Sequence, residues 1–368
     1  FNSGILQNQN INALRKKNYI PLSGELRLTQ SLKSVSRATF ANEWYSYNAG
    51  ILNTGIGLSK TFRKQDNRNP NYKKVFINTK YLINSNNVNH QSEYLLYPNN
   101  WSTNESITNG STWESDQINA SLNIGFEEKY SYHIGKGTYK VSVRTPSILS
   151  DYNYSYAQLE SKNEFKVLKK FDIKTRVFGR IGTNNTPLES SLYLAGANPE
   201  ELLKNDFTKA GGFFPTDWST YGANVNHFQM GGGLNLRGFA GYLAPEISEG
   251  EIAFTNVGNS GTSASMEIDF DRFIKFAPKF TKKWLHIDGY LFSDVGVIAY
   301  HNVSNKNIIG SIRADAGIGS AITIKRMPFN IYKPLTIRFD MPLILNTKQN
   351  NGFDYFDTRF VIGIGRSF

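Results

Sequence analysis

Successive segments of this chain alternate apolar and polar residues with a period of two, and this alternation constrains the fold more than any other feature. In the segment 285–295, for example, Leu291 and Val295 alternate with Tyr290 and Asp294. Residues two apart share one face of a β-strand, so each strand has an apolar and a polar face. The polar faces carry too many charges for the core of a soluble sandwich, whereas a water-filled lumen accommodates them. The pattern therefore predicts an all-β fold, a transmembrane antiparallel β-barrel.

About 13 strands follow from the alternation, and they are expected near residues 24–33, 37–46, 50–62, 73–82, 117–129, 137–146, 154–166, 171–182, 263–271, 284–297, 309–324, 334–344 and 357–368. Closed bacterial barrels made of a single chain prefer an even number of strands. We therefore expect one more strand near 4–13, where the pattern is weak. The prediction is about 14 strands, within a range of roughly 12 to 16, in a single outer-membrane barrel domain that spans residues 1–368.

Composition is compatible with a membrane barrel and argues against other classes of protein. The mean hydropathy of −0.42 resembles that of a soluble protein, but only alternate residues of a membrane barrel meet lipid. The chain contains no cysteine, which excludes disulfides and thiolate metal sites. Its net charge of +11 is scattered along the sequence and not concentrated on one face, so no nucleic-acid partner is expected.

The connections between the predicted strands alternate between short and long. Short connections at 130–136 and 167–170 are typical of periplasmic turns, and the long segment 83–116 is typical of an extracellular loop. The segment 183–262 is about five times longer than a typical loop and contains many apolar residues. Because such a segment would not extend into water, we expect an extracellular loop that folds into the lumen. This topology places the C-terminus on the periplasmic side.

The glycine-rich run 231–242 lies within this loop and contains a single charged residue, Arg237. One reading is an ordinary glycine-rich turn in solvent. If Arg237 is buried, however, it requires a carboxylate partner, because an unpaired buried charge is prohibitive. The alternation independently places Glu267 and Asp294 on the lumen side of their strands.

The residues Leu236-Arg237-Gly238-Phe239 resemble the (V/I/L)-R-G-(F/Y) signature of the BamA/TamA/FhaC superfamily of outer-membrane barrels. Two further matches fall on strands after the loop. The stretch from Phe292 to Gly296 is similar to the family's F-x-D-x-G strand motif. Glu267 matches the acidic position on the strand that lies between the loop and this motif.

The resemblance implies a structural clasp, in which Arg237 pairs with Glu267 and Asp294. Gly238 would let the backbone turn tightly against the wall, and Phe239 would pack beside the charged group. The end of the last predicted strand also resembles an outer-membrane assembly signal, whose residues are Phe360, Ile362, Ile364 and Phe368.

A narrower resemblance concerns residues 192–201 and 227–233, which are similar to the barrel that follows a zinc aminopeptidase domain in Bacteroidetes-type proteins. In that case the catalytic HExxH motif would belong to an upstream peptidase domain. We expect that domain, and any upstream periplasmic (POTRA) domains, to lie outside this chain. The five histidines do not occur at that spacing. We therefore predict no catalytic residue, metal site or cofactor in this chain, and zinc only if an upstream peptidase domain exists.

Basic residues also fall on the predicted lumen face, namely Lys140, Arg144, Lys174, Arg176 and Arg180. They would either attract anions into the lumen or pair with inner acids such as Asp172 and Glu160. We favour pairing, because lumen charges commonly pair across strands.

Three functions remain open at this point. The leading one is a BamA-like barrel in the outer membrane of a Gram-negative bacterium, which serves as a membrane anchor or as a translocation or insertion unit for an attached or partner protein. The alternatives are the membrane half of a zinc aminopeptidase and a passive porin. The expected partners are the lipid bilayer and lipopolysaccharide, the outer-membrane assembly machinery and an envelope protein.

Overall fold

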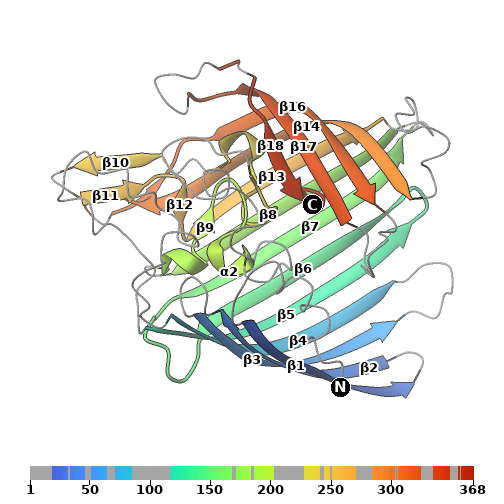
Figure 1. Cartoon of the computed structure of the whole chain (residues 1–368), viewed down its shortest axis with the longest axis vertical. Coiled ribbons are helices and arrows are strands. Elements are labelled where there is room, and N and C mark those ends of the chain that lie inside the picture. The colour runs from blue at the N-terminus through green and yellow to red at the C-terminus, as the bar shows by residue number, and fades with distance from the viewer. Residues whose placement is uncertain are drawn as a thin grey trace.

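The structure is a computed structural model, and it describes residues 19–31, 34–45, 51–63, 71–84, 117–167, 171–183, 186–202, 228–240, 244–248, 251–270, 284–302, 304, 306–324, 335–348, 355–356 and 358–368. Its main feature is a 14-stranded antiparallel sheet that curves round on itself (Figure 1). The strands are β1 (Tyr19–Ser31), β2 (Ser34–Tyr45), β3 (Ile51–Arg63), β4 (Tyr72–Asn84), β5 (Ile118–Tyr132), β6 (Gly135–Pro146), β7 (Ser155–Val167), β8 (Phe171–Thr183), β13 (Ser260–Asp269), β14 (Leu285–His301), β15 (Asn307–Ile309), β16 (Arg313–Ile324), β17 (Leu335–Leu345) and β18 (Val361–Ile364).

Neighbouring strands in the sheet follow one another in the sequence, except that β13 pairs with β8 and β16 pairs with β14. After β8 the chain leaves the sheet for the long segment and returns as β13, which pairs with β8. Strand β15 pairs only with β14. Among the described residues no ladder joins β1 to β18, and Phe228 of the long segment forms a parallel bridge to Ile362 at the β18 edge. The predicted all-β fold class, with about 14 antiparallel strands, is confirmed.

Two strand assignments differ from the prediction. The strand expected near 4–13 lies outside the described residues, and β15 brings the sheet to 14 strands instead. The last strand was expected over 357–368 but covers only Val361–Ile364. The reason is local, because Gly365 adopts a φ of +83°, a left-handed conformation that turns the chain out of the strand.

The two faces of the sheet differ in polarity as the alternation predicts. On β14, Tyr290 and Asp294 are buried, whereas Leu291 and Val295 are 48% and 41% exposed. The same holds on β3–β6, β8, β13, β16 and β17, where exposed apolar side chains include Ile56, Leu58, Val75, Ile77, Ile124, Val143, Val177, Ile181, Met266, Ile318, Ile322, Ile337 and Phe339. Among the described side chains, the outer face is therefore mainly apolar, and the inner face carries most of the charges. Among the described residues, no helix is long and apolar enough to cross a membrane.

Among the described parts of the long segment, residues 192–202 lie on the concave side of the sheet, whereas residues 245–254 project beyond one end of it (Figure 1). The described parts form η4 (Leu188–Ser190), β9 (Leu192–Tyr193), α2 (Pro199–Leu202), η5 (Arg237–Phe239), the pair β10 (Pro245–Ser248) and β11 (Glu251–Phe254), and β12 (Val257–Gly258), which pairs with β9. Apolar side chains of the segment and of the inner wall form one buried cluster, which contains Phe178, Leu192, Leu194, Ala195, Leu234, Leu236, Phe239, Ile298 and Leu345. Burial of these side chains explains why so apolar a segment folds inward.

Glycines on the inner face of β16 leave room for the large side chains of β14. A Cβ added at Gly319 would collide with the Tyr290 ring and with Asp340 Oδ1. We expect Gly319→Ala to destabilise the barrel by about 1–3 kcal/mol, the usual cost of overpacking. Gly179→Ala is the control, because its Cβ would meet nothing nearer than Thr262 Oγ1 at 3.9 Å. Equal midpoints of thermal unfolding for the two variants would contradict this packing.

Candidate functional site: a buried arginine clasp

The backbone before Arg237 is fixed against a neighbouring part of the same segment. Leu234 N–H donates to Tyr193 O at 3.2 Å, and Leu236 N–H donates to Leu194 O at 3.0 Å. Gly233 has a φ of +51°, and a Cβ there would lie 2.8 Å from Tyr193 O, so this close approach requires glycine. Because Leu234 and Leu236 are both fully buried, the next residue projects from an anchored turn towards the wall.

Arg237 begins the short helix η5 and is completely buried. Its guanidinium makes a bidentate contact with Asp294, in which Nε donates to Oδ2 at 2.8 Å and Nη2 donates to Oδ1 at 2.9 Å. Nη1 donates to Glu267 Oε1 at 2.7 Å. The guanidinium carbon also lies 3.9 Å from the centroid of the Phe292 ring, which covers its flat face. We refer to Arg237, Glu267 and Asp294 as the arginine clasp.

The clasp draws on two further carboxylates that the sequence analysis did not single out. Gly238 N–H donates to Asp315 Oδ2 at 2.9 Å, and Asp340 Oδ1 lies 3.9 Å from Arg237 Nη1. Asp340 also accepts a hydrogen bond from the Tyr290 hydroxyl at 2.6 Å and pairs with Arg338. The pairing register of β14 and β16 would have identified Asp315, because this residue lies directly opposite Asp294.

Electrostatics favour the charged form of this arginine. Burial alone would lower the pKa of Arg237, but the Asp294 and Glu267 carboxylates raise that pKa well above its usual value. The guanidinium therefore stays protonated without contact with bulk water.

The other residues of the two motifs have identifiable packing roles. A Cβ at Gly238 would lie 2.7 Å from Asp315 Cβ, and one at Gly296 would lie 2.9 Å from Leu236 Cδ1. Both glycines thus let the loop approach the wall closely. Phe239 is fully buried in the apolar cluster beside the clasp.

The residues of the expected assembly signal are divided between the two faces of the sheet. Ile362 and Ile364 lie in β18. Phe360 stacks on Phe339, with ring centroids 5.9 Å apart, and Phe339 is exposed on the outer face. Phe368 instead lies inside, with its ring 6.0 Å from the Arg237 guanidinium, because the chain turns inward at Gly365.

Contacts with the wall and with the loop hold this inward tail. Arg366 pairs with Asp269 at 2.9 Å and with Asp288 at 3.0 Å. The Asn235 amide donates to Ser367 O at 3.1 Å and to Ser367 Oγ at 2.7 Å. The tail therefore joins the loop to strands β13 and β14.

Glu200 of α2 forms a second attachment of the long segment to the wall. Its carboxylate pairs with Lys80 of β4 at 2.7 Å and with Arg144 of β6 at 2.7 Å. The helix is oriented by reciprocal hydrogen bonds, in which Glu201 N–H donates to Asn198 Oδ1 at 2.8 Å and Asn198 N–H donates to Glu201 Oε2 at 3.2 Å. Sequence analysis missed this attachment, because a helix of four residues gives no periodicity.

Two of the other four lumen-facing basic residues that were singled out pair with acids, and two have other partners. Arg176 pairs with Glu160 at 2.7 Å, as expected. Lys174 pairs with Asp269 at 2.5 Å and not with Asp172. Lys140 lies 5.7 Å from the Phe76 ring centroid, and Arg180 donates to Ser190 O at 3.3 Å.

Beside the second attachment, burial raises the pKa of Glu189 to about 7. Its carboxylate accepts a hydrogen bond from the Asn119 amide at 2.7 Å, which offsets only part of the cost of burying a charge. Among the described residues, no group of three or more His, Asp or Glu side chains could hold a metal ion.

Comparison with solved structures finds chains similar to this one. The crystal structure of BamA from Haemophilus ducreyi lacking POTRA domains 1–3 is similar to this chain with a TM-score of 0.45 and 16% sequence identity. The alignment covers 94% of this chain and 62% of that one, so this chain spans less than two thirds of its length. No family model matches the sequence, and no curated protein matches it.

Removal of the clasp arginine should be costly, because it leaves buried carboxylates without a partner. We expect Arg237→Ala to lower the free energy of unfolding by about 3–5 kcal/mol, measured by urea titration of the lipid-folded protein. Arg237→Lys should restore part of this loss, since an ammonium cannot engage both oxygens of Asp294 in the same fork.

Lys136→Ala is the control for this measurement. Lys136 also pairs with a carboxylate, Glu164 at 3.0 Å, but its side chain is 58% exposed. Its loss should cost less than about 1 kcal/mol. Similar losses for Arg237→Ala and Lys136→Ala would contradict a buried clasp.

The second attachment should depend on pH through Glu189. Since its folded pKa is raised from 4.5 to about 7, its contribution to stability is full below the unfolded pKa and is lost as pH rises through the folded pKa. We expect the wild-type melting temperature to fall between about pH 5 and about pH 8, and Glu189→Gln to remove that part of the dependence. A Glu164→Gln control should retain it, and identical pH profiles for wild type and Glu189→Gln would count against this assignment.

Proposed function

We propose that this chain is an outer-membrane β-barrel with a clasped segment in its lumen, which acts as a membrane anchor or as an insertion or translocation unit for an attached or partner protein. The observation that carries the proposal is the inversion of polarity, with apolar side chains on the outer face of the sheet and buried charges on the inner face. A water-soluble β-protein buries its apolar face instead.

The exposed apolar face supports contact with lipid. It extends through neighbouring strands by direct pairing, from Ile77 to Ile124 and from Ile124 to Val143. Soluble monomers rarely expose continuous apolar surface on this scale. The strands are also long enough, since β4 has 13 residues and a tilted strand needs about 9–11 to cross the hydrocarbon layer.

The attachments of the long segment argue against a passive porin. Glu200 binds β4 and β6, whereas Arg237 binds β13 and β14. The segment is thus tied to two separate parts of the wall through buried ion pairs. An open diffusion channel would have no need of such a costly arrangement.

The connections β5–β6 and β7–β8 at one end of the barrel are short, and β4–β5 and β8–β13 at the other end are long, which supports an orientation with these short turns in the periplasm. In this orientation the tail after β18 also lies on the periplasmic side, and the long segment enters from outside. Outer membranes of Gram-negative bacteria contain barrels of this type, with lipopolysaccharide as a neighbouring lipid.

The zinc aminopeptidase alternative receives no additional support from the described residues. Glu200 and Gln229, in the two stretches that resemble the peptidase-linked barrel, both have structural partners. Glu200 binds Lys80 and Arg144, and Gln229 donates to Ala195 O at 2.6 Å.

The proposal can be tested by electrical recording in planar bilayers. We expect the wild-type barrel to insert and to conduct little, because the segment occupies the lumen. The double variant Glu200→Gln/Arg237→Ala should open more often, with currents at least several-fold larger, and Lys136→Ala should behave as wild type. Large, steady currents from the wild type would favour a porin, and a chain that stays monomeric in water without detergent would refute the membrane barrel.

A further inference from the structure

The inner wall of the barrel is divided by charge. The inward side chains of β4–β7 are mainly basic and include Lys74, Lys80, Lys129, Lys136, Lys140, Arg144 and Lys162, against Glu127, Glu160 and Glu164. The inward side chains of β13–β17 are mainly acidic and include Glu267, Asp269, Asp288, Asp294, Asp315 and Asp340, against Arg313 and Arg338. An object within this lumen therefore experiences a field directed from one wall to the other.

The long segment and the tail match this division. Glu200 neutralises charge on the basic wall, whereas Arg237 and Arg366 neutralise charge on the acidic wall. These contacts leave one part of the basic wall, at the end of the barrel with short turns, without an acid from the long segment or the tail.

Lys129, Thr138 and Lys162 form that part, as one row across β5, β6 and β7. Lys129 pairs in register with Thr138, and Thr138 with Lys162. Side chains directly opposite each other on adjacent strands lie about 5 Å apart at Cβ. Two ammonium groups therefore flank a hydroxyl donor, an arrangement suited to a carboxylate.

These two lysines are poorly neutralised. Lys162 lies 3.2 Å from Glu160 Oε1, but Arg176 Nε already donates to the same oxygen at 2.7 Å. Lys129 makes no ion pair with any residue that the structure describes. The row therefore carries uncompensated positive charge.

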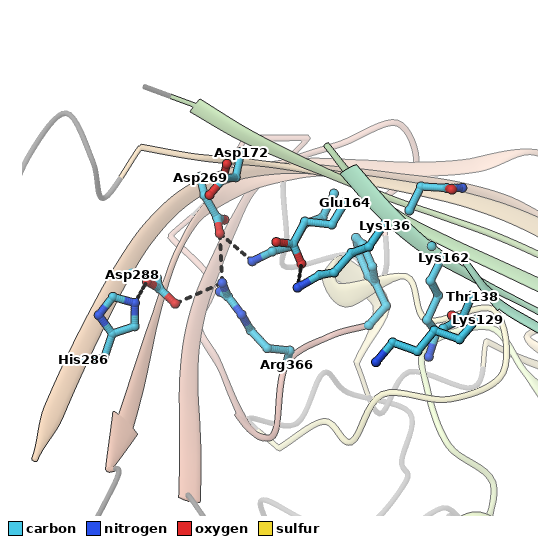
Figure 2. Close-up of a pocket in the computed structure, with 14 residues that line it drawn as sticks. Lys129, Lys136, Thr138, Lys162, Glu164, Asp172, Asp269, His286, Asp288 and Arg366 are labelled. Atoms are coloured by element: carbon cyan, nitrogen blue, oxygen red, sulfur yellow. Dashed lines mark hydrogen bonds and ion pairs between the residues drawn. The ribbon is translucent and has the colours of Figure 1, made fainter. Parts of the chain in front are cut away.

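The row faces a cavity of about 720 Å³, which we call the vestibule. Figure 2 shows Lys129, Thr138 and Lys162 on one side of it and Asp269, Asp288 and Arg366 on the other. Among the residues that line it, Phe368 alone has an apolar side chain. The vestibule has the size of a ligand site, but it has almost no apolar surface for acyl chains.

We infer that the vestibule binds the acidic side chains of a hydrophilic peptide segment from a partner protein, with carboxylates at Lys129, Thr138 and Lys162. The segment would enter from the short-turn end, because the long segment occupies the other part of the lumen. The polar lining favours a peptide over a lipid. That the peptide belongs to a partner protein rests on the proposed function; the binding of acidic side chains does not.

The test is binding of hexaglutamate, labelled with an uncharged fluorophore, to the full chain folded in detergent. Fluorescence anisotropy should show hexaglutamate binding at least about tenfold more tightly than hexaglutamine at low salt, with the difference lost at high salt. Lys129→Gln/Lys162→Gln should weaken hexaglutamate binding about tenfold or more. Lys73→Gln is the matched control, because Lys73 lies near the same end but its side chain is 63% exposed and pairs with Glu128.

Each outcome decides the inference separately from the membrane proposal. Equal binding of the two peptides, or unchanged binding by the double variant, would overturn it even if the barrel inserts into bilayers. Complete displacement of hexaglutamate by inorganic phosphate at matched charge would reduce the site to a general anion site and overturn the peptide ligand. If the double variant does not fold, the salt dependence and the peptide comparison in the wild type still decide the question.

Discussion

The ion pair between Arg237 and Asp294 is the interaction on which the interior of this barrel depends. Two parallel hydrogen bonds, of 2.8 and 2.9 Å, join a fully buried guanidinium to a fully buried carboxylate. Loss of Arg237 would strand the Asp294 carboxylate away from water, and loss of Asp294 would leave Arg237 with Glu267 as its remaining close carboxylate. The pair therefore couples the position of the loop to the register of the wall.

Sequence reasoning recovered the parts of this arrangement that depend on periodicity. Alternation along β13 and β14 was sufficient to place Glu267 and Asp294 on the inner face, and the signature around Arg237 indicated the partner. Asp315 and Asp340 were missed as clasp residues, because their proximity depends on the registers of β16 and β17. Register across several strands is not encoded within any single segment.

Other features escaped prediction because they depend on single backbone conformations or on contacts between distant residues. Gly365 turns the end of the chain inward through one left-handed residue, so Phe368 lies in the lumen and not at the end of a wall strand. Glu200 lies in a helix of only one turn, and its partner Arg144 is 56 residues away. Both features follow the charge of the wall, because Glu200 pairs with a basic residue of β6, and Arg366, in the tail after Gly365, pairs with an acidic residue of β13.

Arg237 and Asp294 stabilise the barrel as a pair. A double-mutant cycle with Arg237→Ala, Asp294→Ala and the double variant isolates this coupling in the unfolding free energy. We expect a coupling energy of about 2–3 kcal/mol, with the double variant more stable than the two single losses imply. A coupling energy below about 0.5 kcal/mol, with additive losses, would contradict it.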